Sequence, residues 1–318
     1  QEELPNPRPR STLSVRMKFR HVILATVVGL LPVSFWAGGE QIVLRPSSSP
    51  TSSPARHAAE PGGTARPAPD APAAEGDSVV RKSNQASKRG CGSAAWLRGK
   101  VHLCNLFVYD RHSRWSDEER RSVVQRMDDA VRFLVGEAAR YRVEVAFSQE
   151  TLADAACEQT IPTDMFAPPN WIGDAVRRLG YDSVNDLVRS VRQRTGCQEV
   201  ALLVHVNKRA TSYNLTFSDG IHGDFHAERA VMFSRYRDGR PTCAGSYAHE
   251  ILHNFGAGEL YFPFDTDTRR KTLAASMFPD DVMCRVDYNL RRISVGEYTA
   301  YRVGWIDRLD PRHKVFED

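Results

Sequence analysis

The 318-residue chain has no block of basic residues interleaved with aromatic side chains. Its net charge is only +4, and its Arg and Lys residues are spread among Asp and Glu. Nucleic-acid-binding proteins usually gather positive charge on one surface, so this distribution argues against a nucleic-acid partner. No internal repeat is apparent, and the sequence gives no sign of oligomerisation either way.

A long apolar run is also missing. The most apolar stretch, residues 22–37, is interrupted by Pro32 and is shorter than the roughly 20 residues that a membrane-spanning helix needs. Basic residues precede this stretch and small residues follow it, which is typical of a secretory signal. We expect residues 1–39 to be an N-terminal extension that contains either a cleaved signal peptide or a membrane anchor at residues 21–38. Both interpretations export the remainder to a secreted, periplasmic or extracellular location.

The next segment has almost no clusters of aliphatic residues. From residue 45 to about residue 90 the composition shifts to Pro, Ser, Ala and Gly. Such a segment cannot bury enough apolar surface to offset the entropy cost of ordering. We therefore predict a disordered linker or pro-region over residues 40–92, followed by a folded domain over residues 93–318.

The most informative stretch runs from His249 to Glu259 and reads HEILHNFGAGE. On a helix, His249 and His253 project from one face, so both imidazoles can bind one cation. Glu250 lies beside that pair and can take a proton from a water bound to the ion. Two neutral nitrogen ligands, an open coordination position and a carboxylate are what a zinc hydrolase needs. Gly256 suits a left-handed residue that ends the helix, after which Glu259 would arrive as a third ligand.

The pattern HExxHxxGxxE resembles the signature of the metzincin zinc peptidases, HExxHxxGxxH/D followed by a Met-turn. Glu259 stands where the family usually has His or Asp, but it still supplies an oxygen donor. Met283, in the sequence DVMC, resembles the Met-turn residue that forms an apolar floor under the zinc histidines. Four residues match the signature position for position: His249, Glu250, His253 and Gly256.

The domain reads as strands alternating with helices, an α/β (α+β) class with a mixed twisted sheet. Ser116 and Glu119 form the capping-box pattern of a long helix. The resemblance implies a metzincin-like zincin domain with a long active-site helix, expected at about residues 244–255. It also implies a late edge strand at residues 230–233, beside which a substrate peptide could pair. The strands are expected at residues 101–109, 143–147, 200–206 and 230–233.

Other residues compete for roles at this site. Glu297 is a rival third ligand, because the thermolysin-like group completes HExxH with a Glu on a separate downstream helix. Glu259 is preferred, since it alone has the Gly-mediated spacing. The family often supplies a Tyr as a second donor to the oxyanion, but the Met-x-Tyr spacing is missing here because Arg285 occupies that position. The candidates for that donor are Tyr288, Tyr261 and Tyr301.

The chain contains further histidines and six cysteines. His205 lies within an apolar strand and is expected to be a packed core residue. His222 and His226 could bind a second metal, although a solvated loop is the preferred interpretation. In an exported chain, six cysteines fit disulfides better than free thiols. The pairings that we expect are Cys243 with Cys284 and Cys157 with Cys197.

The sequence therefore predicts an exported zinc-dependent metalloendopeptidase. One zinc ion would activate a water, Glu250 would act as general base, and the partner would be a peptide or protein substrate. The competing hypothesis is a non-catalytic surface or envelope binding protein stabilised by zinc. Glu250 argues against that alternative, because a structural zinc site usually closes with four protein ligands and has no need of a carboxylate beside its first histidine.

Overall fold

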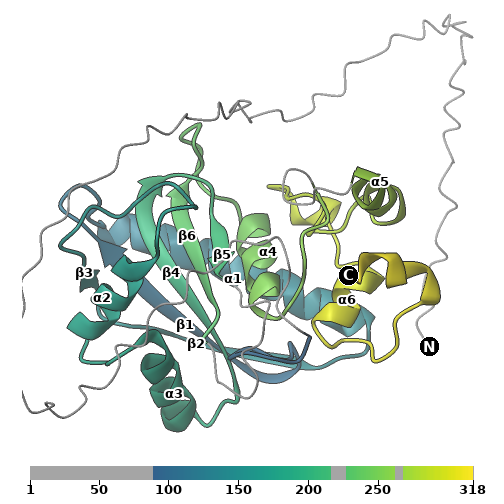
Figure 1. Cartoon of the computed structure of the whole chain (residues 1–318), viewed down its shortest axis with the longest axis horizontal. Coiled ribbons are helices and arrows are strands. Elements are labelled where there is room, and N and C mark those ends of the chain that lie inside the picture. Colours follow the sequence, from purple (N-terminus) through teal and green to yellow (C-terminus); the bar gives the residue numbers. More distant parts are fainter. Residues whose placement is uncertain (1–88, 216–226, 262–267, 318) are drawn as a thin grey trace, which may run out of the picture. The chain divides into compact units, whose positions relative to one another are not determined.

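The computed structural model describes residues 89–215, 227–261 and 268–317, which form a mixed α/β fold (Figure 1). The expected signal or anchor lies outside these residues, as do most of the expected linker and the histidines at positions 222 and 226. Arg89 already belongs to the folded part, because its Nε donates a 2.8 Å hydrogen bond to the carbonyl oxygen of Tyr301. No helix among the described residues is long and apolar enough to cross a membrane.

A mostly parallel sheet organises the described part of the chain. Its strands lie in the order β2-β1-β4-β6-β5, and the short β3 pairs with the end of β1. All neighbouring strands are parallel except β5 and β6, which are antiparallel. The strands are β1 (Gly99–Tyr109), β2 (Val145–Thr151), β3 (Ala155–Ala156), β4 (Glu199–Arg209), β5 (Tyr213–Leu215) and β6 (Arg229–Arg235).

The predicted edge strand at residues 230–233 is not at the edge. These residues belong to β6, which lies between β4 and β5 and is buried along almost its whole length. The edge is formed by β5, which is only three residues long. So short a segment gives no periodicity from which a strand can be recognised.

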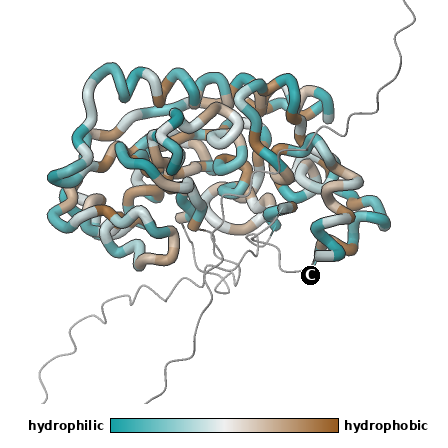
Figure 2. The backbone as a smooth tube through the Cα atoms, turned by 90° about the horizontal axis from the view of Figure 1, so that it is seen from above, coloured by the Kyte–Doolittle hydropathy of each residue, from teal (hydrophilic) through white to brown (hydrophobic). Residues whose placement is uncertain are grey.

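Helices cover both faces of the sheet, as Figure 1 shows. One core cluster joins β1 to α1 and α4, and a second joins the opposite face to α2 and α3. Figure 2 shows α1 as a long helix along one side of the molecule, with hydrophilic and hydrophobic positions alternating. The helices are α1 (Asp117–Arg140), α2 (Asn170–Arg178), α3 (Val184–Thr195), α4 (Ala244–Asn254), α5 (Thr268–Met277) and α6 (Glu297–Arg302), with 3₁₀ turns η1 (Leu290–Arg292) and η2 (Pro311–Phe316).

The start of α1 is the capping box that the sequence predicts. The Ser116 hydroxyl accepts a hydrogen bond from the backbone N–H of Glu119, and the Glu119 carboxylate accepts one from the backbone N–H of Ser116. Each bond satisfies a donor that helix formation would otherwise leave without a partner. From this start α1 runs to Arg140 and packs its apolar side against α4.

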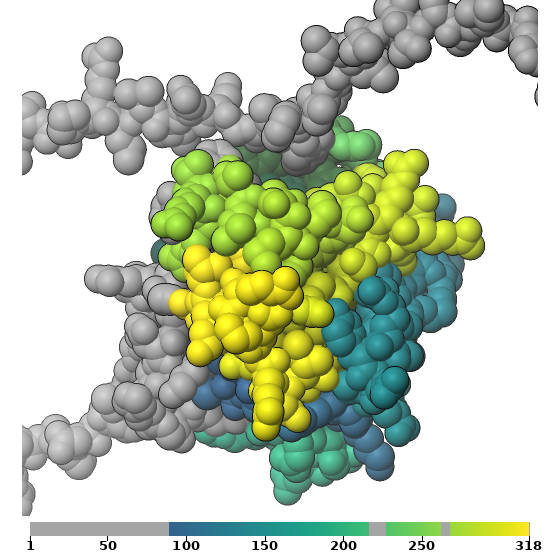
Figure 3. Space-filling view, turned by 90° about the vertical axis from the view of Figure 1, so that its right-hand side faces the viewer, coloured from purple at the N-terminus to yellow at the C-terminus, as the bar shows by residue number. Residues whose placement is uncertain are grey.

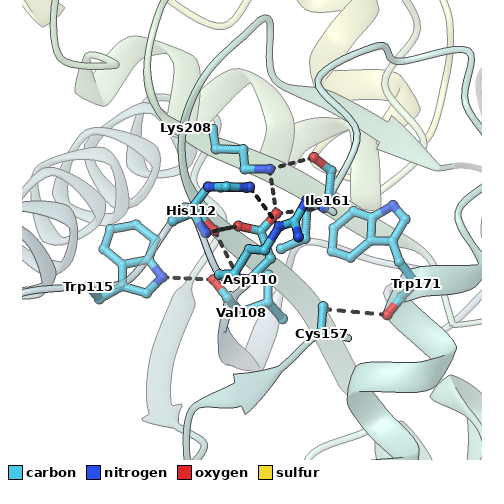
Figure 4. Close-up of polar contacts among 10 residues, drawn as sticks. Val108, Asp110, His112, Trp115, Cys157, Ile161, Trp171 and Lys208 are labelled. Atoms are coloured by element: carbon cyan, nitrogen blue, oxygen red, sulfur yellow. Dashed lines mark hydrogen bonds and ion pairs between the residues drawn. The ribbon is translucent and has the colours of Figure 1, made fainter. Parts of the chain in front are cut away.

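A buried ion pair holds the end of β1 in place (Figure 4). Asp110 follows β1 directly, and its carboxylate pairs with the ammonium group of Lys208 on β4. The same carboxylate accepts a 2.7 Å hydrogen bond from the backbone N–H of Ile161, whose carbonyl oxygen accepts a bond from Lys208. Burial raises the pKa of Asp110, but these hydrogen bonds outweigh it and hold the pKa well below its usual range. The network therefore fixes the connection after β3 to two central strands.

The predicted disulfides are wrong for this structure, in which all six cysteines are free. Cys243 lies against the hydroxyl group of Tyr236, and Cys284 lies against the carbonyl oxygen of Leu260. Burial raises the pKa of Cys157 to about 11 and that of Cys284 to about 12. The buried thiols therefore pack as small apolar side chains, which cysteine spacing alone does not distinguish from disulfide halves.

Candidate metal centre

Helix α4 carries the HExxH residues and is buried along its whole length. Its bounds, Ala244–Asn254, agree with the expected helix at residues 244–255. The chain leaves the helix at Gly256, which adopts a left-handed φ of 86°, as its position in the motif predicts. Arg302 Nε donates a 2.9 Å hydrogen bond to the carbonyl oxygen of Gly256 and so holds this turn from α6.

The structure brings three of the predicted site residues together. The Nε2 atoms of His249 and His253 are 3.0 Å apart. Oε1 of Glu259 lies 3.1 Å from Nε2 of His253 and 3.5 Å from Nε2 of His249. The turn at Gly256 therefore delivers the Glu259 carboxylate to the two imidazoles, as the spacing of the motif predicts.

Backbone carbonyl groups fix the orientation of both imidazole rings. Nδ1 of His249 donates a 2.9 Å hydrogen bond to the carbonyl oxygen of Val282, and Nδ1 of His253 donates a 2.8 Å bond to that of Ala257. A carbonyl oxygen can only accept, so the proton of each neutral ring is on Nδ1. When both rings are neutral, the lone pairs of their Nε2 atoms therefore face the common point that Glu259 also faces. Outer partners of this kind are typical of histidines that bind metals.

A divalent cation fits this donor set. Two imidazole nitrogens and a carboxylate oxygen form a ligand set that zinc accepts in catalytic sites. Oε2 of Glu259 and Oε2 of Glu250 are buried without a hydrogen-bond partner among the described residues. Burial alone would lower the pKa of His249, but the Glu259 carboxylate outweighs it and raises the pKa to about 9. The site thus attracts positive charge, which either a proton or a metal ion can supply.

Glu250 lies beside the three converging residues, but its carboxylate does not join the group of potential ligand atoms that His249, His253 and Glu259 form. Its side chain is buried, and burial raises its pKa, although His249 and His253 act in the opposite direction. Its carbonyl oxygen accepts a 3.0 Å hydrogen bond from Nδ2 of Asn214 on β5. A carboxylate with a raised pKa next to a metal site is suited to accept and return a proton.

The segment around Met283 passes close to α4. Met283 is fully buried in the turn that follows Asp281, and its carbonyl oxygen accepts a 3.1 Å hydrogen bond from the backbone N–H of Leu260. This bond connects the turn to the residue after Glu259. The neighbouring Val282 supplies the acceptor for His249. The turn therefore contacts α4 through His249 and the chain after Glu259 through Leu260.

The rival residues lie elsewhere. Glu297 is not near the two histidines of α4, and its potential ligand atoms group with those of Asp310 and His313. The hydroxyl group of Tyr288 donates a 2.9 Å hydrogen bond to the carbonyl oxygen of Pro241, which gives this side chain a structural contact. The ring of Tyr301 lies under the guanidinium group of Arg89, at 4.2 Å.

Of the candidate tyrosines, Tyr261 is the one beside the site. Its ring centroid is 5.9 Å from that of His249, and burial raises the pKa of its hydroxyl group well above the usual value. His205 is a packed core residue, as expected, and its Nε2 lies 3.0 Å from Oδ1 of Asn105. Sequence reasoning missed that Asn214 bonds to α4 and that Asp281 holds the Met283 turn to Gly296 and Thr299, because these contacts join residues that are distant in sequence.

No family model matches the sequence, and no curated protein matches it. Among solved structures, the chain is similar to metalloproteinase-II from Bacteroides fragilis, with 12% sequence identity and a TM-score of 0.37. The similarity covers 70% of this chain and 57% of that chain, so the match spans less than two thirds of the Bacteroides fragilis protein.

Proposed function

We propose that the chain is an exported zinc-dependent metalloendopeptidase of metzincin-like type. The observation that supports this proposal is the convergence of His249 Nε2, His253 Nε2 and Glu259 Oε1 at distances of 3.0–3.5 Å, with Glu250 beside them. These three residues would hold one zinc ion. Met283 would be the Met-turn residue, since it is buried in the turn that contacts the metal-site segment.

The bound ion would polarise the peptide carbonyl group and lower the pKa of a bound water. Glu250 would take the proton from that water and pass it to the leaving amine. Its buried position supports this role, because a carboxylate with a raised pKa can return the proton as well as accept it. The Tyr261 hydroxyl group is our candidate for a second donor to the oxyanion, because its ring lies beside that of His249.

A peptide is the substrate class that the sheet supports. Strand β5 forms the edge of the sheet next to α4, and Asn214 on β5 bonds to both Glu250 and Asn254 on that helix. An extended peptide that pairs alongside an edge strand presents its carbonyl groups at regular spacing. Pairing along β5 would place such a peptide near Glu250. Residues 230–233 cannot pair with a peptide in this way, because β6 already has β4 and β5 as neighbours.

The test is proteolysis by the purified full chain. An unstructured protein should be cleaved, a chelator should stop the cleavage, and added zinc should restore it. Glu250→Gln should keep the zinc, because Glu250 is not in the ligand group, and should lower the rate by about 10²- to 10⁴-fold. A chain that binds zinc but cleaves no peptide in a broad library would overturn the proposal and favour the zinc-stabilised binding protein.

A further inference from the structure

A second group of potential metal ligands lies in the C-terminal segment. Glu297 begins α6, Asp310 precedes η2, and His313 lies within η2. One ligand atom from each of these residues lies within 4.8 Å of the other two. Figure 3 views this face, with α6 and η2 in yellow beside α5 in green. An open pocket of about 600 Å³ adjoins the group and is lined by Glu297 and His313.

The buried histidine of this group is the observation that points to a ligand. His313 is only 3% exposed, and its Nδ1 has no hydrogen-bond partner among the described residues. That atom lies 3.9 Å from Oε2 of Glu297, too far for a hydrogen bond. The ring of Phe278 packs edge-on against the imidazole, with centroids 4.9 Å apart. A buried nitrogen held without a partner costs free energy that a bound cation would remove.

Arg312 is the nearest competitor for this site. Its Nη2 lies 2.7 Å from Oδ2 of Asp310. The Arg312 side chain is 76% exposed, however, so its ion pair with Asp310 is screened by solvent and weak. Arg312 donates to both Asp310 oxygens, through its backbone N–H and Nε to Oδ1 and through Nε and Nη2 to Oδ2, so a cation would bind Asp310 by displacing this exposed guanidinium group. The Glu297 side chain is 58% exposed, and its Oε2 atom already lies on the side of His313 Nδ1.

We propose that Glu297, Asp310 and His313 bind a second divalent cation of the zinc class. One imidazole nitrogen and two carboxylate oxygens are a donor set for zinc or a neighbouring first-row metal, with water in the remaining positions. The ion would connect η2 to α6. The N–H of Gly296, just before α6, donates a hydrogen bond to Asp281, so the ion would also stabilise the position of α6 against the turn beside α4.

The test compares zinc content in the full chain after chelator treatment and equilibrium dialysis against micromolar zinc. Glu297→Gln should hold one zinc ion fewer than the wild type, whether or not the α4 centre is loaded. Glu118→Gln, which changes an exposed carboxylate on α1, is the matched control and should lose none. Equal zinc contents in the two variants would overturn the proposal, as would binding at this site only at millimolar zinc.

A second measurement separates this site from the proposed protease centre. Zinc should raise the melting temperature of the wild type and of Glu118→Gln more than that of Glu297→Gln, because a ligand stabilises the folded state that binds it. Any proteolytic activity should remain in Glu297→Gln. If Glu297→Gln instead abolished proteolysis, the residue would belong to the α4 centre and the second site would be excluded. If no variant, including the wild type, cleaved peptides, the proposed protease function would fail, but the second metal site would still be judged by the zinc contents.

Discussion

The carbonyl oxygen of Val282 accepts a 2.9 Å hydrogen bond from Nδ1 of His249. This bond orients the imidazole so that its Nε2 faces His253 and Glu259. The position of the Val282 carbonyl depends in turn on Asp281, whose buried carboxylate holds the turn. That carboxylate accepts hydrogen bonds from Met283 N, Gly296 N and Thr299 Oγ1 at 2.7, 2.8 and 2.8 Å. Asp281 is thus a positioning residue for His249.

The variant Asp281→Asn should weaken both folding and zinc binding. An amide NH₂ would face one of the three donors, so at least one buried hydrogen bond would be lost, at a cost of about 1–3 kcal/mol. Zinc affinity at the α4 centre should fall about 10-fold or more, as it does when an outer partner of a ligand is removed. Denaturant unfolding and competition with a chelator measure the two effects. Asp280→Asn is the control, because Asp280 is exposed; equal effects in both variants would contradict the positioning role.

Replacing Glu259 separates the two candidates for the third ligand. Glu259→Ala removes the oxygen that lies 3.1 Å from His253, so zinc affinity at α4 should fall by more than the roughly 100-fold loss expected for an outer partner. Proteolysis should be lost with it. Glu297→Ala should leave proteolysis intact, because Glu297 groups with Asp310 and His313. Loss of proteolysis in Glu297→Ala alone would reverse the assignment.

Local signals in the sequence predict the parts of the site that are local in the structure. The capping box at Ser116 and the positive φ of Gly256 each depend on a few neighbouring residues. The convergence of His249, His253 and Glu259 follows from helix geometry and one tight turn. These features could therefore be read from the chain before any tertiary contact was known.

The remaining features depend on contacts between distant segments. The edge position of β5 is set by pairing with β6, and three residues carry no pattern that shows it. Glu297 lies on a helix downstream of HExxH, as expected of a rival ligand, yet the fold places its Oε2 atom 3.9 Å from Nδ1 of His313. Cysteine spacing cannot show that Cys284 packs against Leu260 and that Cys243 packs against Tyr236, so that neither thiol pairs with the other. Sequence reasoning fails in these places because tertiary packing decides among options that are locally equivalent.

Removing one partner of the ion pair between Asp110 and Lys208 should strongly lower the free energy of unfolding. Lys208→Met would leave the Asp110 carboxylate, which is fully buried, without its charged partner, and such losses cost about 3–5 kcal/mol. Three hydrogen-bond donors to Asp110 would remain, so we expect a loss near the lower end of that range of about 3–5 kcal/mol. Lys100→Met, at an exposed position, is the control for denaturant unfolding. In a double-mutant cycle, adding Asp110→Asn should recover part of the loss; purely additive losses would exclude the coupling.

Zinc binding at α4 should release protons and weaken as the pH falls. In the metal-free chain the Glu259 carboxylate raises the pKa of His249 to about 9, against the lowering effect of burial. Below about pH 9 His249 is therefore protonated, and the ion must displace that proton to bind Nε2. Each unit of decrease in pH should then lower the apparent affinity by up to about 10-fold, with about one proton released per ion.

Calorimetry in buffers of different ionisation enthalpy measures that proton release directly. Glu259→Gln provides the comparison, because an uncharged amide no longer raises the pKa of His249. In that variant the release of protons at pH 7.5 should nearly disappear, while the affinity itself falls through loss of a charged ligand. A wild-type chain that binds zinc at pH 7.5 without releasing protons would show that His249 is already neutral. The carboxylate of Glu259 would then not control the charge of the site.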